Sequence, residues 1–310
     1  MAVEAGRSRS ESDAWKRNSR GREVRERIIK ILLTACAYLS IFTTIGIVVV
    51  LFEESVRFFL DVSAFEFLFT TRWAPQEGDF GVLPLVYGTL MATFIAIAVA
   101  LPVGLLTAIY LSEYAPHRLR RWLKPALEIL AGVPTVVYGY FALTFITPFL
   151  RDNVFPGMGS FNALSAGLIM GVMIIPTVAS VSEDAIYAVP RALREGAYAL
   201  GATKRETATK VVIQAALSGI VAAVILGVSR AIGETMIVTI AMGSQANWGG
   251  SPLEGMQAMT AYIVQVVGGE TPRESATFKS IFAVGSALFL ITLALNLVSY
   301  WFVRRFREIY

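Results

Sequence analysis

The sequence predicts an all-α integral membrane protein with about six transmembrane helices. Of its 310 residues 55% are hydrophobic and only 16% are charged, whereas soluble domains carry about 25% charged residues. The apolar residues gather in runs of about 20 or more, the length that a membrane-spanning helix needs. Lys and Arg are concentrated in every second connecting segment, which is typical of a multi-pass membrane protein.

The first 27 residues contain many Ser and Arg residues and have no apolar period. We interpret residues 1–27 as a flexible cytoplasmic tail. The apolar run that follows is too long for a signal peptide and lacks a small-residue cleavage site, so we expect it to be retained as the first span. Residues 28–310 are then expected to form a single transmembrane domain.

Six apolar segments are expected to span the membrane. Pro and Gly inside several of them predict tilted or kinked helices. Between the spans, the outer segment 243–278 contains an apolar run too short to span, which predicts an interfacial or re-entrant helix. The predicted spans are Ile28–Phe52, Leu83–Leu111, Pro125–Leu150, Ala163–Val189, Val211–Met242 and Ile281–Val303.

The distribution of basic residues orients these spans. The N-terminal tail, "HRLRRWLK", the segment 190–210 and "RRFREIY" are rich in Lys and Arg, and the alternate segments are not. Because Lys and Arg are retained on the cytoplasmic side, both termini are expected to face the cytoplasm, which an even number of spans requires.

The cytoplasmic segment 190–210 predicts a short amphipathic helix, a glycine turn and a second helix. Pro190 suits the first turn of a helix, and Gly201 can adopt the left-handed conformation that ends one. Thr203 and Glu206 have the spacing of a capping box that starts the next helix. The face of the first helix is small and rich in alanine, which favours entry into a protein groove over an anchor on lipid.

Two charges interrupt the fifth predicted span. Arg230 and Glu234 would share a helix face, and a charge at the centre of a span costs about 2.5–3.5 kcal/mol. Small residues recur every four positions beside them and predict a closely packed seam; they are Gly219, Ala223, Gly227, Ala231, Thr235 and Thr239. A second such pair, Gly167 and Gly171, lies in the fourth span.

Other polar residues are expected to be ordinary. Glu183 and Asp184 lie near the cytoplasmic end of the fourth span, where solvation suffices. His117 stands alone in a basic loop, and no metal site is expected.

"EGAYALGATKRETATKVVI" resembles the EAA loop of bacterial ABC importer permeases, which docks on the ATPase. Glu195, Gly196, Ala197 and Gly201 occupy the positions of that motif. The chain departs from the family pattern at Gly196, where alanine is usual, and at Ile213 and Gln214 (not the usual Leu-Pro).

Further blocks resemble one branch of that family. "FGVLPLVYGTL", "LPVGLLTAIYLSEYAP", "EILAGVPTVVYGYFAL" and "SRAIGETM" are similar to PstC-type permease subunits of the phosphate-specific importer. The resemblance runs from about Phe80 to Met242. It implies a type I, MetI-like fold in the bacterial inner membrane.

The resemblance also implies partners. These are a PstA-type sister permease, two copies of an ATPase subunit and a periplasmic phosphate-binding protein, within a lipid bilayer and without nucleic acid. No Walker A pattern occurs in the sequence, so ATP and Mg²⁺ would be bound by the separate ATPase, and this chain would need no cofactor and would not be an enzyme.

Within this framework Arg230 is expected to line the translocation path and to bind phosphate briefly, because its planar guanidinium matches two phosphate oxygens. Glu234 would offset that charge or accept a hydrogen bond from a P–OH group. Gly233 and Thr235 complete the predicted path. The alternative is a structural ion pair to a neighbouring helix or to the sister subunit.

Three other functions stay open on sequence alone. A permease for sulfate or molybdate would share this fold. A membrane enzyme would need a nucleophile–base or metal constellation, and none is visible in the sequence. A structural or sensory subunit would have no path of its own.

Overall fold

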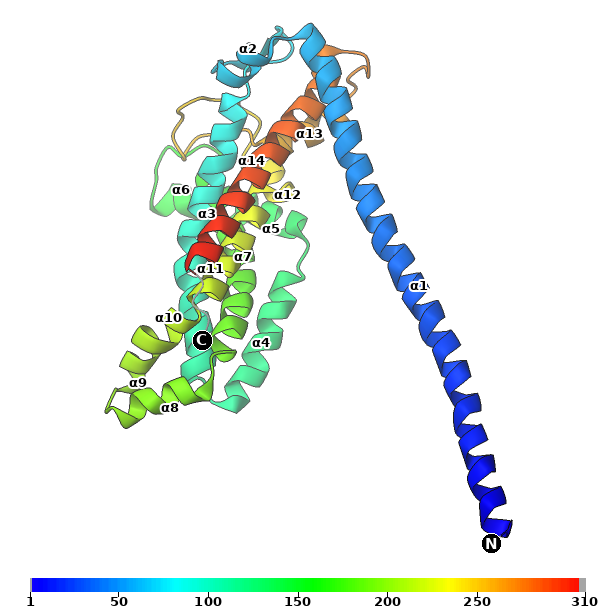
Figure 1. Cartoon of the computed structure of the whole chain (residues 1–310). Coiled ribbons are helices and arrows are strands. Elements are labelled where there is room, and N and C mark those ends of the chain that lie inside the picture. The colour runs from blue at the N-terminus through cyan, green and yellow to red at the C-terminus, as the bar shows by residue number, and fades with distance from the viewer. Residues whose placement is uncertain (1, 307–310) are drawn as a thin grey trace. The chain divides into compact units, whose positions relative to one another are not determined.

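The computed structural model describes the backbone of residues 2–306 and the side chains of residues 22, 23 and 25–301. It divides into two units, residues 1–53 and residues 54–310, and each is described by itself. Apart from one short hairpin, the regular structure in the described residues is helical (Figure 1).

Unit 1 consists of the greater part of helix α1 (Ala2–Asp61). The predicted tail therefore differs from the structure, in which residues 2–27 are helical. No proline interrupts the sequence before Pro75, and the charged residues include a helical pair in which Arg22 lies 3.0 Å from Glu26. Such i,i+4 pairs favour helix. The predicted domain division at residue 27 stays a prediction.

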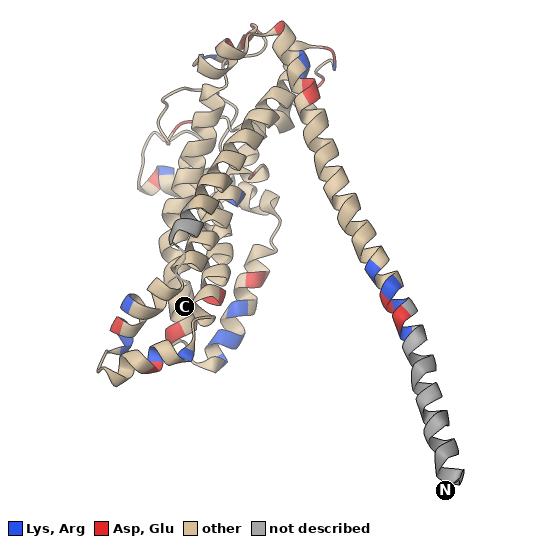
Figure 2. Cartoon of the chain, in the orientation of Figure 1, with Lys and Arg blue, Asp and Glu red and all other residues tan. Residues whose placement is uncertain are grey.

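The prediction of about six spans is confirmed. Four helices are long and apolar enough to cross a membrane, and two further spans result when each of two bent helix pairs is taken as one. The four are Arg25–Asp61 within α1, Leu83–Tyr114, Ala163–Tyr187 and Ala276–Trp301. Figure 2 shows that charged residues gather at the ends of the helices of unit 2 and largely avoid their middles.

The centre of unit 2 is the packing of α3 (Leu83–Ile109) on α7 (Ala163–Tyr187), with α11 (Leu217–Ile232) against both. Glycines permit this close approach, as predicted. A Cβ atom at Gly171 would lie 2.8 Å from the Ala96 carbonyl oxygen of α3, and one at Gly227 would lie 3.0 Å from Val178. The small-residue seams therefore hold these three helices together.

The third predicted span is sharply bent. Helix α4 (His117–Ala131) and the segment made of α5 (Thr135–Phe141), the π-helical turn η2 (Ala142–Ile146) and α6 (Thr147–Asn153) meet at 85°. Pro134 precedes the first residue of α5 and has no N–H to continue α4, and it disfavours helical geometry in the preceding residue. The predicted span Pro125–Leu150 is therefore a bent helix pair, in keeping with the kinks that its Pro and Gly residues predict.

The fifth predicted span, Val211–Met242, is broken twice. After α8 (Arg191–Ala199) the chain forms α9 (Lys204–Glu206), η3 (Thr207–Val212) and α10 (Ile213–Ala215). It then bends by 71° into α11. A second break separates α11 from α12 (Met236–Ala241). The single stripe of small residues is therefore continuous only within α11.

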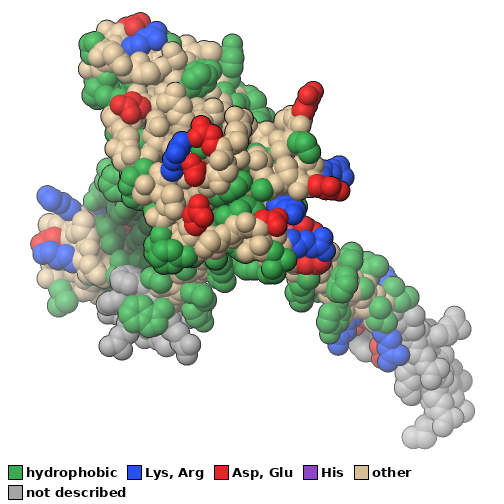
Figure 3. All heavy atoms as spheres, turned by 90° about the horizontal axis from the view of Figure 1, so that it is seen from above, with side chains coloured by type: hydrophobic (Ala, Val, Ile, Leu, Met, Phe, Trp, Pro, Cys, Tyr) green, Lys and Arg blue, Asp and Glu red, His purple; other side chains and the backbone are tan. Residues whose placement is uncertain are grey.

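One end of unit 2, at the top of Figure 1, lies away from α8 and α9. It is formed by α2 (Ala64–Phe69), the strands β1 (Trp73–Ala74) and β2 (Asp79–Phe80), α13 (Met259–Gly268) and the start of α14 (Ala276–Phe306). The strands are antiparallel, with Trp73 opposite Phe80. Several acidic side chains lie on this face in Figure 3.

Aromatic side chains form the core of this end. The rings of Trp73 and Tyr262 meet edge to face with centroids 4.8 Å apart. Burial raises the pKa of Tyr262 to about 12, and its hydroxyl lies 2.7 Å from that of Ser280. Helix α13 is the apolar segment predicted to be interfacial or re-entrant, and it falls short of a span.

The η1 turn (Tyr110–Tyr114) extends α3 at the other end, where α4, α8 and α9 also lie. A separate apolar cluster of residues from α3, α7 and the η3–α11 segment holds this end together, with Ile186, Val212 and Ile220 among its buried members. It positions the segment 190–210 against the spans.

Candidate functional site

The sequence "SRAIGET" forms the break between α11 and α12. Helix α11 ends at Ile232 with Gly233 as its C-cap, and Glu234 and Thr235 are left between the helices. Gly233 is exposed and Thr235 is half-buried. The Thr235 hydroxyl donates to the Gly233 carbonyl at 3.2 Å, so the break is an ordered turn.

Glu234 stabilises the break through hydrogen bonds of its side chain and its backbone. Its Oε1 accepts hydrogen bonds from the backbone N–H groups of Met236 at 3.1 Å and Ile237 at 3.3 Å. The Thr260 hydroxyl of α13 donates to the Glu234 carbonyl oxygen at 2.7 Å. Glu234 is only 8% exposed. Its carboxylate therefore satisfies N–H groups at the start of α12 that have no partner within that helix.

Arg230 lies in the last turn of α11 and is half-buried. Its Nη1 donates to the Thr177 hydroxyl oxygen of α7 at 3.0 Å. Within the part of the chain whose side chains are described, the structure shows no carboxylate paired with Arg230. A guanidinium has five N–H donors, so one hydrogen bond to Thr177 leaves most of its donors available.

The expectation that Arg230 and Glu234 share one helix face was wrong, because α11 ends between them. The chain leaves the helix after Ile232, and Glu234 turns to the amides of α12. Sequence reasoning also missed Thr177 and Thr260, because their contacts depend on how helices distant in the sequence pack.

The segment 190–210 has the local structure that the sequence predicts. Pro190 is the N-cap of α8, and Gly201 ends that helix region with φ of 81°. Thr203 accepts from the Glu206 amide, and the Glu206 side chain accepts from the Thr203 amide at 3.0 Å. The capping box is thereby confirmed.

Arg194 anchors α8 to the spans. Its Nη2 donates to Glu113 of η1 at 2.8 Å and to the Ile186 carbonyl at 2.9 Å, and its Nη1 donates to the Val189 carbonyl at 2.6 Å. Both charged side chains are largely buried. Movement of α8 is therefore linked directly to the ends of α3 and α7.

The motif residues of α8 lie mostly on its free side. Glu195, Gly196 and Gly201 are exposed and Ala197 is half-buried. A Cβ at Gly196 would meet nothing within 4 Å. Leu200, next to the turn, is 91% exposed. Tyr198 of α8 is exposed as well. An otherwise small helix surface from which these two side chains project is suited to a groove of another protein.

Glu183 is buried, whereas the sequence predicted that solvent would surround it. It is only 1% exposed, and it forms ion pairs with Arg120 and with Lys124, whose Nζ lies 3.0 Å away. Lys124 also pairs with the exposed Asp184 at 2.9 Å. Buried carboxylates need such partners, and they come from α4, about 60 positions earlier in the chain.

A metal-ion site is not formed by the described side chains, since no three of their His, Cys, Asp and Glu residues come together in a suitable group. His117 is exposed, as expected.

The region that contains these sites matches a known protein family. Residues 100–308 match the model of the family described as "Binding-protein-dependent transport system inner membrane component". The matched region contains α8, its glycine turn and the break at Gly233.

The chain belongs to this family. It is accordingly a multi-pass membrane protein and a permease component of an ABC-type transport system, and not an enzyme. Members of this family work within complexes of several subunits.

Relatives of known name resemble nearly the whole chain. A probable ABC transporter permease protein, YqgH of Bacillus subtilis, is 36% identical, with 91% of this chain and 92% of the relative covered. The phosphate transport system permease protein PstC of Xylella fastidiosa is 31% identical over 90% of this chain and 92% of its own length.

Solved permease structures have the same fold. The methionine transporter MetNI in an inward-facing form aligns with a TM-score of 0.55 at 21% identity, covering 74% of this chain and 95% of that one. A bacterial alginate ABC transporter aligns with a TM-score of 0.57 at 14% identity, covering 85% and 96%. The predicted MetI-like fold is confirmed.

Proposed function

We propose that this permease component translocates inorganic phosphate, delivered by a periplasmic binding protein, into the cytoplasm. The single observation that supports this most strongly is Arg230, a half-buried arginine in a membrane segment that donates to Thr177 and forms no ion pair with a described carboxylate. A buried cation is costly, and an anion that passes would compensate for it. PstC relatives support phosphate as that anion.

Arg230 would offer its planar donors to two phosphate oxygens. Thr177 would hold the guanidinium in place between substrate ions. Gly233 follows the last turn of α11, where Arg230 lies, and contributes no side chain there. The Thr235 hydroxyl lies in the same break. These residues form the proposed substrate path.

Glu234 has two roles in this proposal. Through Oε1 it caps α12 and keeps the break open. Through Oε2, which accepts no hydrogen bond within the described part of the chain, it would accept a hydrogen bond from a P–OH group. Phosphate carries such a proton near neutral pH and sulfate does not, so this contact would favour phosphate.

ATP would drive the cycle from outside this chain. The proposed partners are a PstA-type sister permease, which completes the path, and two ATPase subunits, which bind ATP and Mg²⁺. Glu195, Gly196, Ala197, Leu200 and Gly201 would dock on an ATPase. Arg194 would pass the movement of α8 to η1 and α7 through its bonds to Glu113, Ile186 and Val189.

In this arrangement the α8 end faces the cytoplasm, and so do both termini. The basic residues of α4, α8 and α9 support that orientation, because Lys and Arg are retained on the cytoplasmic side. The end with α2 and α13 would face the binding protein.

Competition uptake tests the substrate. The chain is reconstituted with its three partners in proteoliposomes, and ATP-driven uptake of radiolabelled phosphate is measured with excess unlabelled phosphate, arsenate or sulfate. We expect phosphate and arsenate to compete and sulfate not to compete. Equal competition by sulfate, or uptake of labelled sulfate, would favour a permease for another oxyanion.

A further inference from the structure

The α8 end of unit 2 contains a basic recess of about 340 Å³ that the transport path does not use. It is enclosed by η1, by the N-terminal turn of α4, by the end of α7 and by the start of α8. Its charged lining consists of Glu113, Arg120, Arg191 and Arg194, so three arginines face one carboxylate. His117 and Tyr187 complete much of the wall.

Most of the charged groups in the recess already have partners. Arg194 and Glu113 bind one another, and Arg120 pairs with Glu183. Arg191 is exposed and forms no ion pair with any described side chain. The recess therefore has an excess of positive charge, and Arg191 is the donor most available to a ligand.

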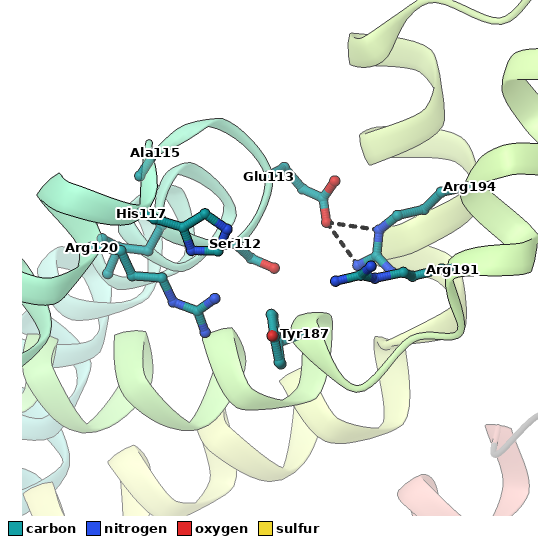
Figure 4. Close-up of a pocket in the computed structure, with 9 residues that line it drawn as sticks. Ser112, Glu113, Ala115, His117, Arg120, Tyr187, Arg191 and Arg194 are labelled. Atoms are coloured by element: carbon teal, nitrogen blue, oxygen red, sulfur yellow. Dashed lines mark hydrogen bonds and ion pairs between the residues drawn. The ribbon is translucent and has the colours of Figure 1, made fainter.

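Ser112 provides a second, independent indication. Its hydroxyl oxygen is buried and has no hydrogen-bond partner among the described residues. A buried hydroxyl without a partner is unfavourable. In Figure 4 the Ser112 hydroxyl and the Arg120 guanidinium point into the same space, with Arg191 across it and Tyr187 below. A ligand oxygen in this space would satisfy the hydroxyl.

The guanidinium of Arg120 is already positioned. It lies over the Tyr187 ring, 4.2 Å from the centroid. Glu183 accepts from its Nη2, and the other N–H groups of Arg120 have no hydrogen-bond partner among the described residues. A neighbouring hollow of about 500 Å³ shares His117, Arg120 and Tyr187 with the recess. It adds Arg121, Lys124 and Glu128 to the charged lining, and Lys124 is itself paired with Glu183 and Asp184.

We propose that this recess binds a phosphoryl oxyanion between Arg191, Arg120 and Ser112. Donors that converge from α8, α4 and η1 match a tetrahedral group, whereas a planar carboxylate is matched by a single guanidinium fork. The bound group would be either inorganic phosphate or the phosphodiester of an anionic lipid. By linking Arg191 of α8 to α4, it would restrain the helix that docks on the ATPase.

The experiment separates the two sources. All chains carry Arg230→Gln, which removes the arginine of the proposed path, and are purified in a maltoside detergent without phosphate. In one arm, equilibrium binding of radiolabelled inorganic phosphate is measured. In the other, phosphatidylglycerol is added and the lipids retained are counted by native mass spectrometry. The test variants are Arg191→Gln and Ser112→Ala, and the control is Arg118→Gln, an exposed arginine of α4 outside the recess.

We expect binding in at least one arm, weakened by about tenfold or more in Arg191→Gln because a charge-assisted hydrogen bond is lost. Ser112→Ala should weaken it less and should fold normally, since its hydroxyl has no partner to lose. Arg118→Gln should bind as the parent does. Thermal unfolding checks that each variant is folded.

Three results would overturn the proposal. One is the absence of binding in both arms. Another is equal weakening by Arg118→Gln and Arg191→Gln, which would show diffuse attraction to basic residues. The third is weaker retention of the ATPase by Arg191→Gln without any change in anion binding, which would assign the recess to an acidic side chain of that subunit.

Discussion

Arg194 donates to the Glu113 carboxylate at 2.8 Å and thereby joins helix α8 to the turn that ends the second span. The same guanidinium binds two backbone carbonyls at the end of α7. One side chain thus connects the proposed ATPase-docking helix to two of the central helices.

Removing this connection should uncouple the transporter. Arg194→Gln loses charge-assisted bonds to Glu113, each worth about 1.5–3 kcal/mol, and it leaves carbonyls of α7 without their donor. We expect a lower unfolding temperature and ATP hydrolysis that no longer drives uptake. Glu113→Gln should be milder, because Arg194 keeps its bonds to Ile186 and Val189. Arg205→Gln, an exposed arginine in α9, is the control. Wild-type coupling in Arg194→Gln would contradict this role.

Gly201 and Gly196 form a matched pair within the docking segment. Gly201 has φ of 81°, whereas Gly196 is in α8 with ordinary geometry, and a Cβ at either would meet nothing within 4 Å. Gly201→Ala should cost about 1–2 kcal/mol through backbone strain, and the reoriented turn should release the ATPase during co-purification. Gly196→Ala should be neutral or stabilising. Equal retention of the ATPase by both variants would show that the turn conformation is not required.

The α3–α7 seam depends on Gly171. An added Cβ would lie 2.8 Å from the Ala96 carbonyl oxygen and 2.9 Å from Val99 Cβ. Gly171→Ala should therefore separate the two helices and destabilise the protein by about 1–3 kcal/mol, the usual cost of overpacking. Gly268→Ala is the control, because a Cβ there meets nothing within 4 Å. Thermal unfolding in detergent distinguishes them. Identical unfolding temperatures would show that the seam is looser than the structure indicates.

Two substitutions separate the roles of Glu234. Glu234→Ala removes the cap of α12 and should lower stability by about 1 kcal/mol. Glu234→Gln keeps an oxygen that accepts from the Met236 and Ile237 amides, so stability should change little. It loses the negative charge and the proposed acceptor for P–OH. We therefore expect Glu234→Gln to unfold near the wild-type temperature while its preference for phosphate over sulfate falls. Unchanged selectivity in Glu234→Gln would limit Glu234 to its capping role.

Residue patterns predict much of this fold and little of its polar contacts. The six apolar segments and the capping box at Thr203 depend on nearby residues, and both were correct. The Pro and Gly residues inside the spans predict kinks, but hydropathy gives neither the 85° bend before α5 nor the complete break at Gly233. The second break takes Glu234 off the helix face that it was expected to share with Arg230, and its carboxylate caps α12.

Tertiary pairing explains the other differences. The burial of Glu183 depends on Arg120 and Lys124, and the hydrogen bond of Arg230 depends on Thr177, 53 positions away. Helix packing creates these contacts, and the spacing of residues along the sequence does not predict them. The burial of Ser112 beside three arginines is of the same kind.

The central claim is that Arg230 binds phosphate in transit. ATP-driven uptake of radiolabelled phosphate is measured in proteoliposomes that contain all the partner subunits, with Arg230→Gln and the control Arg151→Gln, an arginine in the last turn of α6 whose side chain is 41% exposed. We expect assembly to be intact in both variants, uptake by Arg151→Gln to equal that of the wild type, and uptake by Arg230→Gln to fall by about tenfold or more. Wild-type uptake by an assembled Arg230→Gln transporter would contradict the claim.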